Sequence, residues 1–268
     1  DQVIIANGTY SGTGNTDLDT LGKAITVRSE NGPETCILDC QGDGRCFTFQ
    51  SNETSDTVIQ GFSMVNGFEL GGAAVRVDNS SPQIINCIMQ NNEGLVSGGA
   101  MFVGDGDSPT ITGCIMADNV TWMPGGCGGA VRANSSAAIF EDCLFLNNSS
   151  GYGGAVCESW SENQYLNCVF SGNSAKDLGG AIHFDGNCQS IVGGAPEYGC
   201  RFLNNRAGSG SDLYREPISY GPEPDFDPID VSYNSFQGHA DSAFWINPVE
   251  KFILTGCIFD TTPVTQDL

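Results

Sequence analysis

The sequence predicts an all-β chain that folds as one parallel β-helix, or β-solenoid, of roughly nine to ten coils. Two motifs recur along it every 25–32 residues, and a period in this range indicates stacked supersecondary units. One motif is Gly-Gly-Ala followed by an apolar residue, and the other is Cys-x-[Met/Phe]-x-x-Asn. Helical periodicity is absent. Short apolar triplets instead alternate with clusters of Gly, Asn, Ser and Asp, which is the pattern of strands and turns.

The totals limit the classes of partner. A formal charge of −22 with only ten Lys and Arg residues argues against nucleic acid and against an anionic membrane surface, because both require a basic footprint. No apolar run reaches the roughly 18 residues of a membrane-spanning helix, so we expect no direct membrane insertion. We interpret residues 1–268 as a single domain, with a Pro-rich and acidic insertion at about 215–230.

The elements follow the repeat along the chain. A strand-like segment at residues 3–10 opens it, which indicates a mature product or an excised fragment. A degenerate coil at residues 58–66 precedes the regular copies. Gly-Gly-Ala then begins at Gly71, Gly98, Gly128, Gly153 and Gly179, and the Cys motif begins at Cys87, Cys114, Cys143, Cys168 and Cys200. The long gap between Cys200 and Cys257 fits two coils, one of them carrying the insertion.

Each coil therefore has columns that stack on those of its neighbours. Bulky apolar residues lie three positions before the Cys, and Met or Phe lies two positions after it. We expect these columns to form the core of stacked parallel strands about 4.8 Å apart. An Asn lies five positions after each Cys, and such a column can form hydrogen bonds up and down the stack. The glycine pair supplies backbone conformations for a tight corner. The Asn column comprises Asn92, Asn119, Asn148, Asn173 and Asn205.

The combination of Gly-Gly-Ala-[Ile/Val] with Phe-x-x-Asn resembles the repeats of the polymorphic outer membrane protein family. More broadly, it is similar to right-handed parallel β-helix proteins of bacterial and algal surfaces. The resemblance covers about residues 61–205. It implies a right-handed helix, and it leaves the function open, because the same scaffold carries adhesins, structural surface proteins and polysaccharide lyases.

The twelve cysteines divide into two groups. The motif cysteines share one column, where parallel side chains have poor disulfide geometry, so we expect buried thiols there. The candidates for disulfides lie outside the column: a bridge within Cys36, Cys40 and Cys46, and a bridge between Cys127 and Cys157. No Cys-x-x-Cys and no paired His spacing is present, so the cysteines predict no metal centre.

One outward column of side chains is the candidate binding face. If Val75, Val131 and Ile182 point inward, the residues that follow them point outward, because strand side chains alternate. The expected binding residues are Arg76, Phe102, Arg132 and His183, with Cys157 among them and with Glu158 and Asp185 beside them. A lyase needs a base and a group that neutralises a uronate carboxylate. As an alternative, Arg132, Glu158, His183 and Asp185 supply those parts, although a mixed exposed strand face needs no function.

Two further kinds of site are expected at the surface. Acidic clusters at Asp105-Gly106-Asp107 and in the insertion, including Asp225 and Asp227, offer oxygen ligands for a structural Ca²⁺ ion; no other cofactor is predicted. Glycosylation motifs in turns begin at Asn7, Asn52, Asn79 and Asn134. The motifs at Asn119 and Asn148 belong to the inward Asn column, so we expect them to be unused.

The leading functional hypothesis is a non-enzymatic, secreted or cell-surface module with a structural or adhesive role, as a subunit of a larger surface assembly. Its partners would be other subunits or cell-surface glycans. One alternative is a polysaccharide lyase or another carbohydrate-active enzyme acting on the outer face. A second is a non-catalytic glycan-binding module, for which the candidate exposed aromatic residues are Phe102, Trp122, Tyr152 and Trp160.

Overall fold

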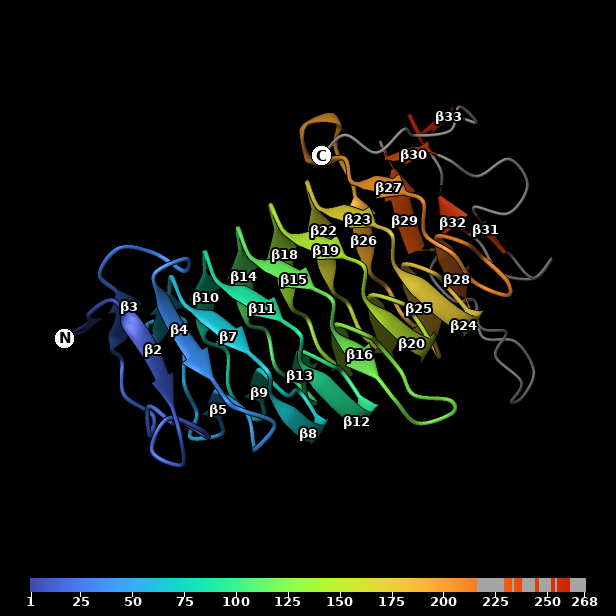
Figure 1. Cartoon of the computed structure of the whole chain (residues 1–268). Helices are drawn as coiled ribbons and strands as arrows, with labels where there is room; N and C mark the ends of the chain where they lie inside the picture. The colour runs from blue at the N-terminus through green and yellow to red at the C-terminus, as the bar shows by residue number, and fades with distance from the viewer. Residues whose placement is uncertain (216–228, 233, 238–243, 246–251, 254, 261–268) are drawn as a thin grey trace.

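The computed structural model describes residues 1–215, 229–232, 234–237, 244–245, 252–253 and 255–260. It is a solenoid in which each strand pairs in parallel with the equivalent strand of the next coil (Figure 1). The all-β parallel β-helix that the sequence predicts is confirmed. One short 3₁₀ helix, Pro196–Tyr198, interrupts the described strands. Among the described residues, no helix combines the length and the apolar character needed to cross a membrane.

The two longest sheets, A and B, meet at a corner of the coil, where a strand of sheet A is followed by a strand of sheet B. Sheet A contains β1 (Gln2–Ile5), β3 (Thr26–Ser29), β6 (Val58–Gln60), β10 (Gln83–Ile85), β14 (Thr110–Thr112), β18 (Ile139–Glu141), β22 (Gln164–Leu166), β26 (Ile191–Gly193), β29 (Ile229–Ser232) and β32 (Phe252–Ile253). Sheet B contains β2 (Gly8–Ser11), β4 (Cys36–Asp39), β7 (Ser63–Val65), β11 (Ile88–Gln90), β15 (Ile115–Ala117), β19 (Leu144–Leu146), β23 (Val169–Ser171), β27 (Arg201–Leu203), β30 (Ser235–Gln237) and β33 (Ile258–Asp260).

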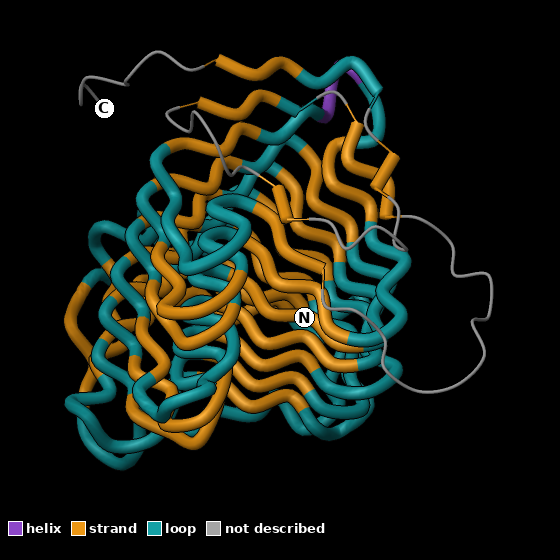
Figure 2. Tube along the Cα trace, turned by 90° about the vertical axis from the view of Figure 1, so that its right-hand side faces the viewer, coloured by secondary structure: helices purple, strands orange, loops and turns teal. Residues whose placement is uncertain are grey.

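Two further sheets complete the coil. Sheet C contains β5 (Phe47–Phe49), β9 (Val75–Val77), β13 (Met101–Val103), β17 (Val131–Asn134), β21 (Val156–Ser159), β25 (Ile182–Asp185), β28 (Leu213–Arg215) and β31 (Phe244–Trp245). Sheet D contains β8 (Phe68–Gly71), β12 (Glu93–Ser97), β16 (Val120–Thr121), β20 (Ser149–Tyr152) and β24 (Ser174–Leu178). Figure 2 shows the strands of successive coils lying one above the other.

The number of turns is slightly lower than expected. Within the described residues, sheets A and B hold ten strands each, whereas sheet C holds eight, so about eight turns are complete rather than nine to ten. The central coils also contain a fourth strand, which belongs to sheet D. The insertion expected at about 215–230 lies largely outside the described residues.

The predicted apolar columns fill the interior. Aromatic rings stack parallel from coil to coil, with centroid separations of 4.6 Å for Phe145–Phe170, 4.9 Å for Phe170–Phe202 and 4.8 Å for Phe202–Phe236. These separations match the strand spacing, so the ladder of backbone hydrogen bonds and the ring stack are satisfied together. The motif cysteines Cys87, Cys114, Cys143, Cys168 and Cys200 are buried free thiols, as the column argument predicts.

The Asn column forms the expected internal ladder. Asn148 is typical: its Oδ1 accepts hydrogen bonds from the backbone N and the Nδ2 of Asn119, both at 3.0 Å. Its own Nδ2 donates to the Met116 carbonyl at 2.9 Å and to Asn173 Oδ1 at 3.0 Å. Each buried amide therefore satisfies the turn backbone of the coil before it.

The glycine pairs mark the corner where sheet D leads into sheet C. Gly153 has φ = 60°, a left-handed conformation that favours glycine. Gly154 has an ordinary φ, yet a Cβ there would lie 2.1 Å from the Gly180 carbonyl oxygen. One glycine is thus required by backbone conformation and the next by the close approach of the neighbouring coil.

Candidate functional site

The outward positions of sheet C form one column, called here the outer column. Parallel pairing sets its register, because each outward residue is the Cα partner of the one in the next coil. The inward neighbours, such as Val75 and Val131, are fully buried. The alternation argued from the sequence therefore has the phase that we expected. The outer column comprises Thr48, Arg76, Phe102, Arg132, Cys157, His183 and Tyr214.

Arg76 and Phe102 form the first part of the face. The Arg76 guanidinium carbon lies 4.4 Å from the centre of the Phe102 ring, which is a cation–π contact. Arg76 Nε also donates to Asp78 Oδ2 at 2.5 Å. Both contacts hold the guanidinium over the ring, and the Arg76 side chain remains 33% exposed. This pair therefore presents a partly solvated cation beside an aromatic surface.

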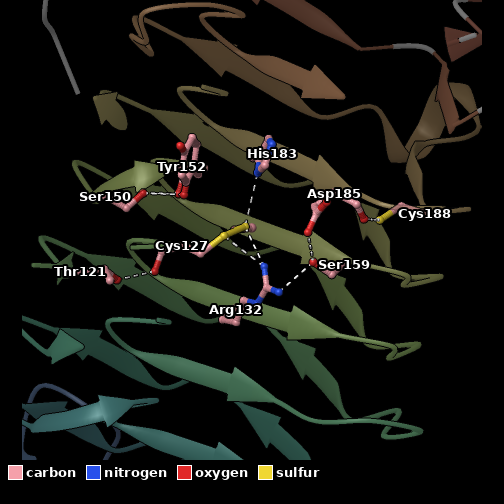
Figure 3. Close-up of a disulfide and its surroundings, with 12 residues drawn as sticks. Thr121, Cys127, Arg132, Ser150, Tyr152, Ser159, His183, Asp185 and Cys188 are labelled. Atoms are coloured by element: carbon pink, nitrogen blue, oxygen red, sulfur yellow. Dashed lines mark hydrogen bonds between the residues drawn. A yellow bond between two sulfur atoms is a disulfide. The ribbon is translucent and has the colours of Figure 1, made fainter. Parts of the chain in front are cut away.

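A disulfide between Cys127 and Cys157 marks the second part of the face (Figure 3). Cys157 lies on β21, and Cys127 ends the loop that follows β16 in the preceding coil. Of the two bridges expected from the sequence, the structure forms this one. Cys36, Cys40 and Cys46 are buried free thiols, although Cys40 Sγ and Cys46 Sγ lie only 2.9 Å apart.

Arg132 lies against both sulfur atoms. Its Nη1 donates to Cys127 Sγ at 3.1 Å and to Cys157 Sγ at 2.9 Å, and its Nη2 donates to Ser159 Oγ at 2.8 Å. The Ser159 hydroxyl in turn donates to Asp185 Oδ2 at 2.8 Å. Burial lowers the pKa of the Arg132 guanidinium, and the Asp185 carboxylate opposes that effect. Asp185 thus acts on Arg132 through Ser159.

His183 lies on the other side of the disulfide (Figure 3). Its Nδ1 is 3.5 Å from Cys157 Sγ. The imidazole stacks on Tyr152 at a centroid distance of 5.4 Å and is tilted against Tyr214 at 5.5 Å. Only 3% of its surface is exposed. The ring is therefore part of an aromatic stack and has little direct access from solvent.

Glu158 corrects one expectation. We expected it beside the outer column, but it points into the core and is fully buried. The Tyr165 hydroxyl donates to its Oε1 at 2.6 Å, and the Ser190 hydroxyl donates to its Oε2 at 2.5 Å. Burial raises the pKa of this carboxyl group. The reason for the misplacement is strand alternation: the residue after the outward Cys157 must point inward.

The chemistry of this region includes one set of soft metal ligands. Cys127 Sγ, Cys157 Sγ and a ring nitrogen of His183 lie within 4.8 Å of one another. Two thiolates and an imidazole suit Zn²⁺ or Cu⁺, but a disulfide offers no thiolate, so only the reduced pair would provide this set. The sequence spacing did not reveal the cluster, because its members come from different coils.

The expected Ca²⁺ ligands remain a prediction. Asp225 and Asp227 lie outside the described residues. In the Asp105–Asp107 turn, Asp105 Oδ1 accepts a hydrogen bond from Asn134 Nδ2, and Asp107 Oδ1 accepts one from the Ser80 backbone N at 2.7 Å. These carboxylates therefore already form hydrogen bonds to the neighbouring coils.

The four expected glycosylation positions lie in turns or at strand ends. Asn7, Asn52 and Asn79 are exposed, whereas Asn134 is half-buried. Asn119 and Asn148 belong to the buried ladder, as expected. The exposed positions therefore leave room for a glycan, whereas the two buried positions of the Asn column do not.

Sequence reasoning missed several members of the face. Tyr214 follows Gly210-Ser211-Asp212-Leu213, a degenerate copy of the Gly-Gly-Ala motif, and this likeness is the signal that would have located it. Thr48 follows a similarly degenerate copy. Ser159 has no motif of its own. Tyr152 was expected as an exposed aromatic residue, but it is half-buried against His183. Only the stacking of adjacent coils brings Ser159 to Arg132 and Tyr152 to His183.

A stack of parallel coils with apolar, aromatic and Asn ladders defines the class of parallel β-helix repeat proteins. The chain belongs to the family described as right-handed β-helix region, whose family model matches residues 23–207. Among solved structures, it is similar to a pectin methylesterase from Yersinia enterocolitica, with 9% identity and a TM-score of 0.44 over 99% of this chain and 87% of the other. A pectin methylesterase mutant in complex with hexasaccharide IV gives 10% identity, a TM-score of 0.44 and coverages of 99% and 82%. No curated protein matches the chain.

Proposed function

We propose that the chain is a secreted or cell-surface structural and adhesive module that binds glycans along the outer column. The observation that carries the proposal is the Arg76–Phe102 pair, a partly exposed cation held over an aromatic ring. Sugar rings stack on aromatic faces, and a guanidinium pairs with carboxylates. A uronate-bearing oligosaccharide is therefore the class of ligand that best fits this face.

The disulfide supports the proposed location. Disulfides persist mainly in oxidising compartments such as the cell exterior, and Cys127 and Cys157 are bonded here. A surface role also agrees with the resemblance to polymorphic outer membrane protein repeats, which remains a prediction beyond the broader β-helix family.

A second surface favours the assembly part of the proposal. Apolar side chains of sheet D and of the loop after β16 are 42–63% exposed and come from three neighbouring coils. Backbone hydrogen bonds join these coils; for example, Met123 N donates to Leu95 O. A contiguous exposed apolar strip is typical of a protein interface, so we infer that another subunit docks there. The strip comprises Phe68, Leu70, Val96, Trp122 and Met123.

The catalytic alternative uses the same face and receives less support from its geometry. A lyase base must reach a carbon-bound proton of the sugar, but His183 packs against two tyrosine rings and is 3% exposed. Glu158, the carboxylate expected to assist it, points into the core. Binding without bond cleavage therefore fits the positions of these groups better.

The test is calorimetric titration of the full chain with neutral and uronate-bearing oligosaccharides. We expect the uronate-bearing series to bind, and Phe102→Ala to weaken binding by at least tenfold, which is about 1.4 kcal/mol. Tyr198→Ala is the matched control, because this exposed aromatic residue lies in the 3₁₀ helix, away from the outer column.

Absence of binding in every series, or an equal loss in both variants, would reject the glycan-binding face. Absorbance from an unsaturated product during the same incubation would replace binding with the lyase alternative. Solution scattering over a range of protein concentrations tests the assembly separately: a monomer at all concentrations would contradict docking of a second copy on sheet D.

A further inference from the structure

The two cysteines of the Cys127–Cys157 disulfide differ in their exposure to solvent. Cys127 is half-buried and ends a loop in which residues 122–125 are exposed. Cys157 is fully buried on β21. An incoming nucleophile from solvent therefore reaches Cys127 Sγ first, and the bond to Cys157 is the one that would break.

The cation Arg132 lies close to both sulfur atoms. Arg132 Nη1 is 3.1 Å from Cys127 Sγ and 2.9 Å from Cys157 Sγ, whereas His183 Nδ1 is 3.5 Å from Cys157 Sγ. A cationic guanidinium at hydrogen-bond distance stabilises a thiolate, and a stabilised thiolate is the better leaving group in disulfide exchange. The greater exposure of Cys127 thus sets the point of attack, and Arg132 stabilises the thiolate that is left on Cys157.

We propose that this disulfide is a thiol–disulfide exchange site that accepts a molecule bearing a free thiol. The thiolate of the incoming molecule attacks Cys127 Sγ and forms a new S–S bond, while the Cys127–Cys157 bond breaks. Its electron pair remains on Cys157 Sγ as a thiolate beside Arg132, and the proton lost by the incoming thiol goes to solvent. The product is a mixed disulfide that attaches the thiol-bearing molecule to the exposed loop.

A further thiol near Arg132, that of the buried Cys188, does not compete in the exchange. Cys188 lies close enough to Arg132 to interact with its charge, but its Sγ donates to the Asp185 carbonyl at 3.2 Å. Burial raises the pKa of Cys188 to about 12, so its thiol stays protonated at neutral pH. The mixed disulfide at Cys127 therefore does not rearrange readily onto Cys188.

The experiment uses reduced glutathione as the thiol and the full oxidised chain as the disulfide. After acid quenching, newly released thiols are alkylated and the modified peptides are located by mass spectrometry. We expect glutathione on Cys127 and the alkyl group on Cys157, at a rate above that of glutathione with its own disulfide. Glutathione on Cys157, or a rate below that reference, would overturn the proposal.

The charge argument is tested by Arg132→Met, for which we expect exchange about tenfold slower because the leaving thiolate loses its cation. Arg28→Met is the matched control, since this half-buried arginine lies on β3 of sheet A, and its rate should stay within about twofold of the original. Equal rates in all three proteins would contradict the role of Arg132. If Arg132→Met fails to fold, the position of the adduct and the rate of its formation on the original chain still test the proposal. No glycan enters the experiment, so its outcome is independent of the proposed function.

Discussion

Asp212 shows how a single buried carboxyl group makes stability depend on pH. It is fully buried, and its Oδ1 accepts a hydrogen bond from Asn205 Nδ2 at 2.9 Å, at the C-terminal end of the Asn ladder. Burial raises the pKa of Asp212 from 3.8 to about 7, against the opposing effect of that hydrogen bond. Between these two values, the folded protein holds a proton that the unfolded chain has lost.

The sign of the effect on stability follows from proton linkage. The stability that Asp212 contributes is fully present below about pH 4 and is lost as the pH rises through about 7. Asp212→Asn removes this loss and retains the Oδ1 acceptor. We expect the variant to gain stability relative to the original by up to about 4 kcal/mol between pH 4 and pH 8. Urea unfolding at several pH values measures this difference, and a constant difference across the range would contradict it.

At the scale of the element, the Asn ladder and the glycine corner connect one coil to the next. A buried amide in the ladder serves four hydrogen bonds, two as acceptor and two as donor, so its loss leaves backbone groups unsatisfied on both sides. The Gly154 corner tolerates no Cβ for a different reason, which is contact with the Gly180 carbonyl. The ladder is the more informative of the two to test, because Asn147, which precedes the ladder residue Asn148 in sequence, provides a control.

We expect Asn148→Ala to lower the free energy of unfolding by at least about 3 kcal/mol, because several buried hydrogen bonds lose their partner. Asn147→Gly is the control: Asn147 is exposed with φ = 54°, a conformation that glycine adopts freely. Thermal unfolding of both variants measures the contrast. If the two variants lost similar stability, the ladder would not be the element that holds adjacent coils together.

At the scale of the whole molecule, each coil contacts mainly its two neighbours, so stability accumulates along the stack. The Cys127–Cys157 bond adds a covalent link between adjacent coils and closes a loop with a sequence separation of 30. Restricting the unfolded chain in this way is worth about 3–4 kcal/mol. The link therefore stabilises the middle of the stack, at the outer column proposed to bind glycans.

We expect the double variant Cys127→Ser, Cys157→Ser to unfold at a lower denaturant concentration, with a loss of about 3 kcal/mol. The control is Cys188→Ser, which changes a buried thiol in the same region that forms no disulfide. Treatment of the original chain with a phosphine reductant should reproduce the effect of the double variant. An unchanged unfolding midpoint after reduction would show that the link contributes nothing to the stability of the stack.

The sequence by itself determined the parallel β-helix, its ladders and the inward or outward phase of sheet C. These properties repeat in every coil, so each copy of a motif reinforces the same prediction. It also indicated the Cys127–Cys157 pair and the cations on the outer face. The expected position of Glu158 beside the outer column was wrong. Strand side chains alternate, so the residue that follows the outward Cys157 points inward.

Only the tertiary structure decided which side chains of different coils meet. The contacts of Arg132 with two sulfur atoms, of Ser159 with Asp185 and of His183 with two tyrosines depend on loop lengths that vary from coil to coil. The fourth strand of sheet D and the number of complete turns depend on the same irregular segments. The repeat specifies the structure that all coils share. The candidate site is instead built from residues and segments that differ from one coil to the next, and packing between neighbouring coils sets their positions.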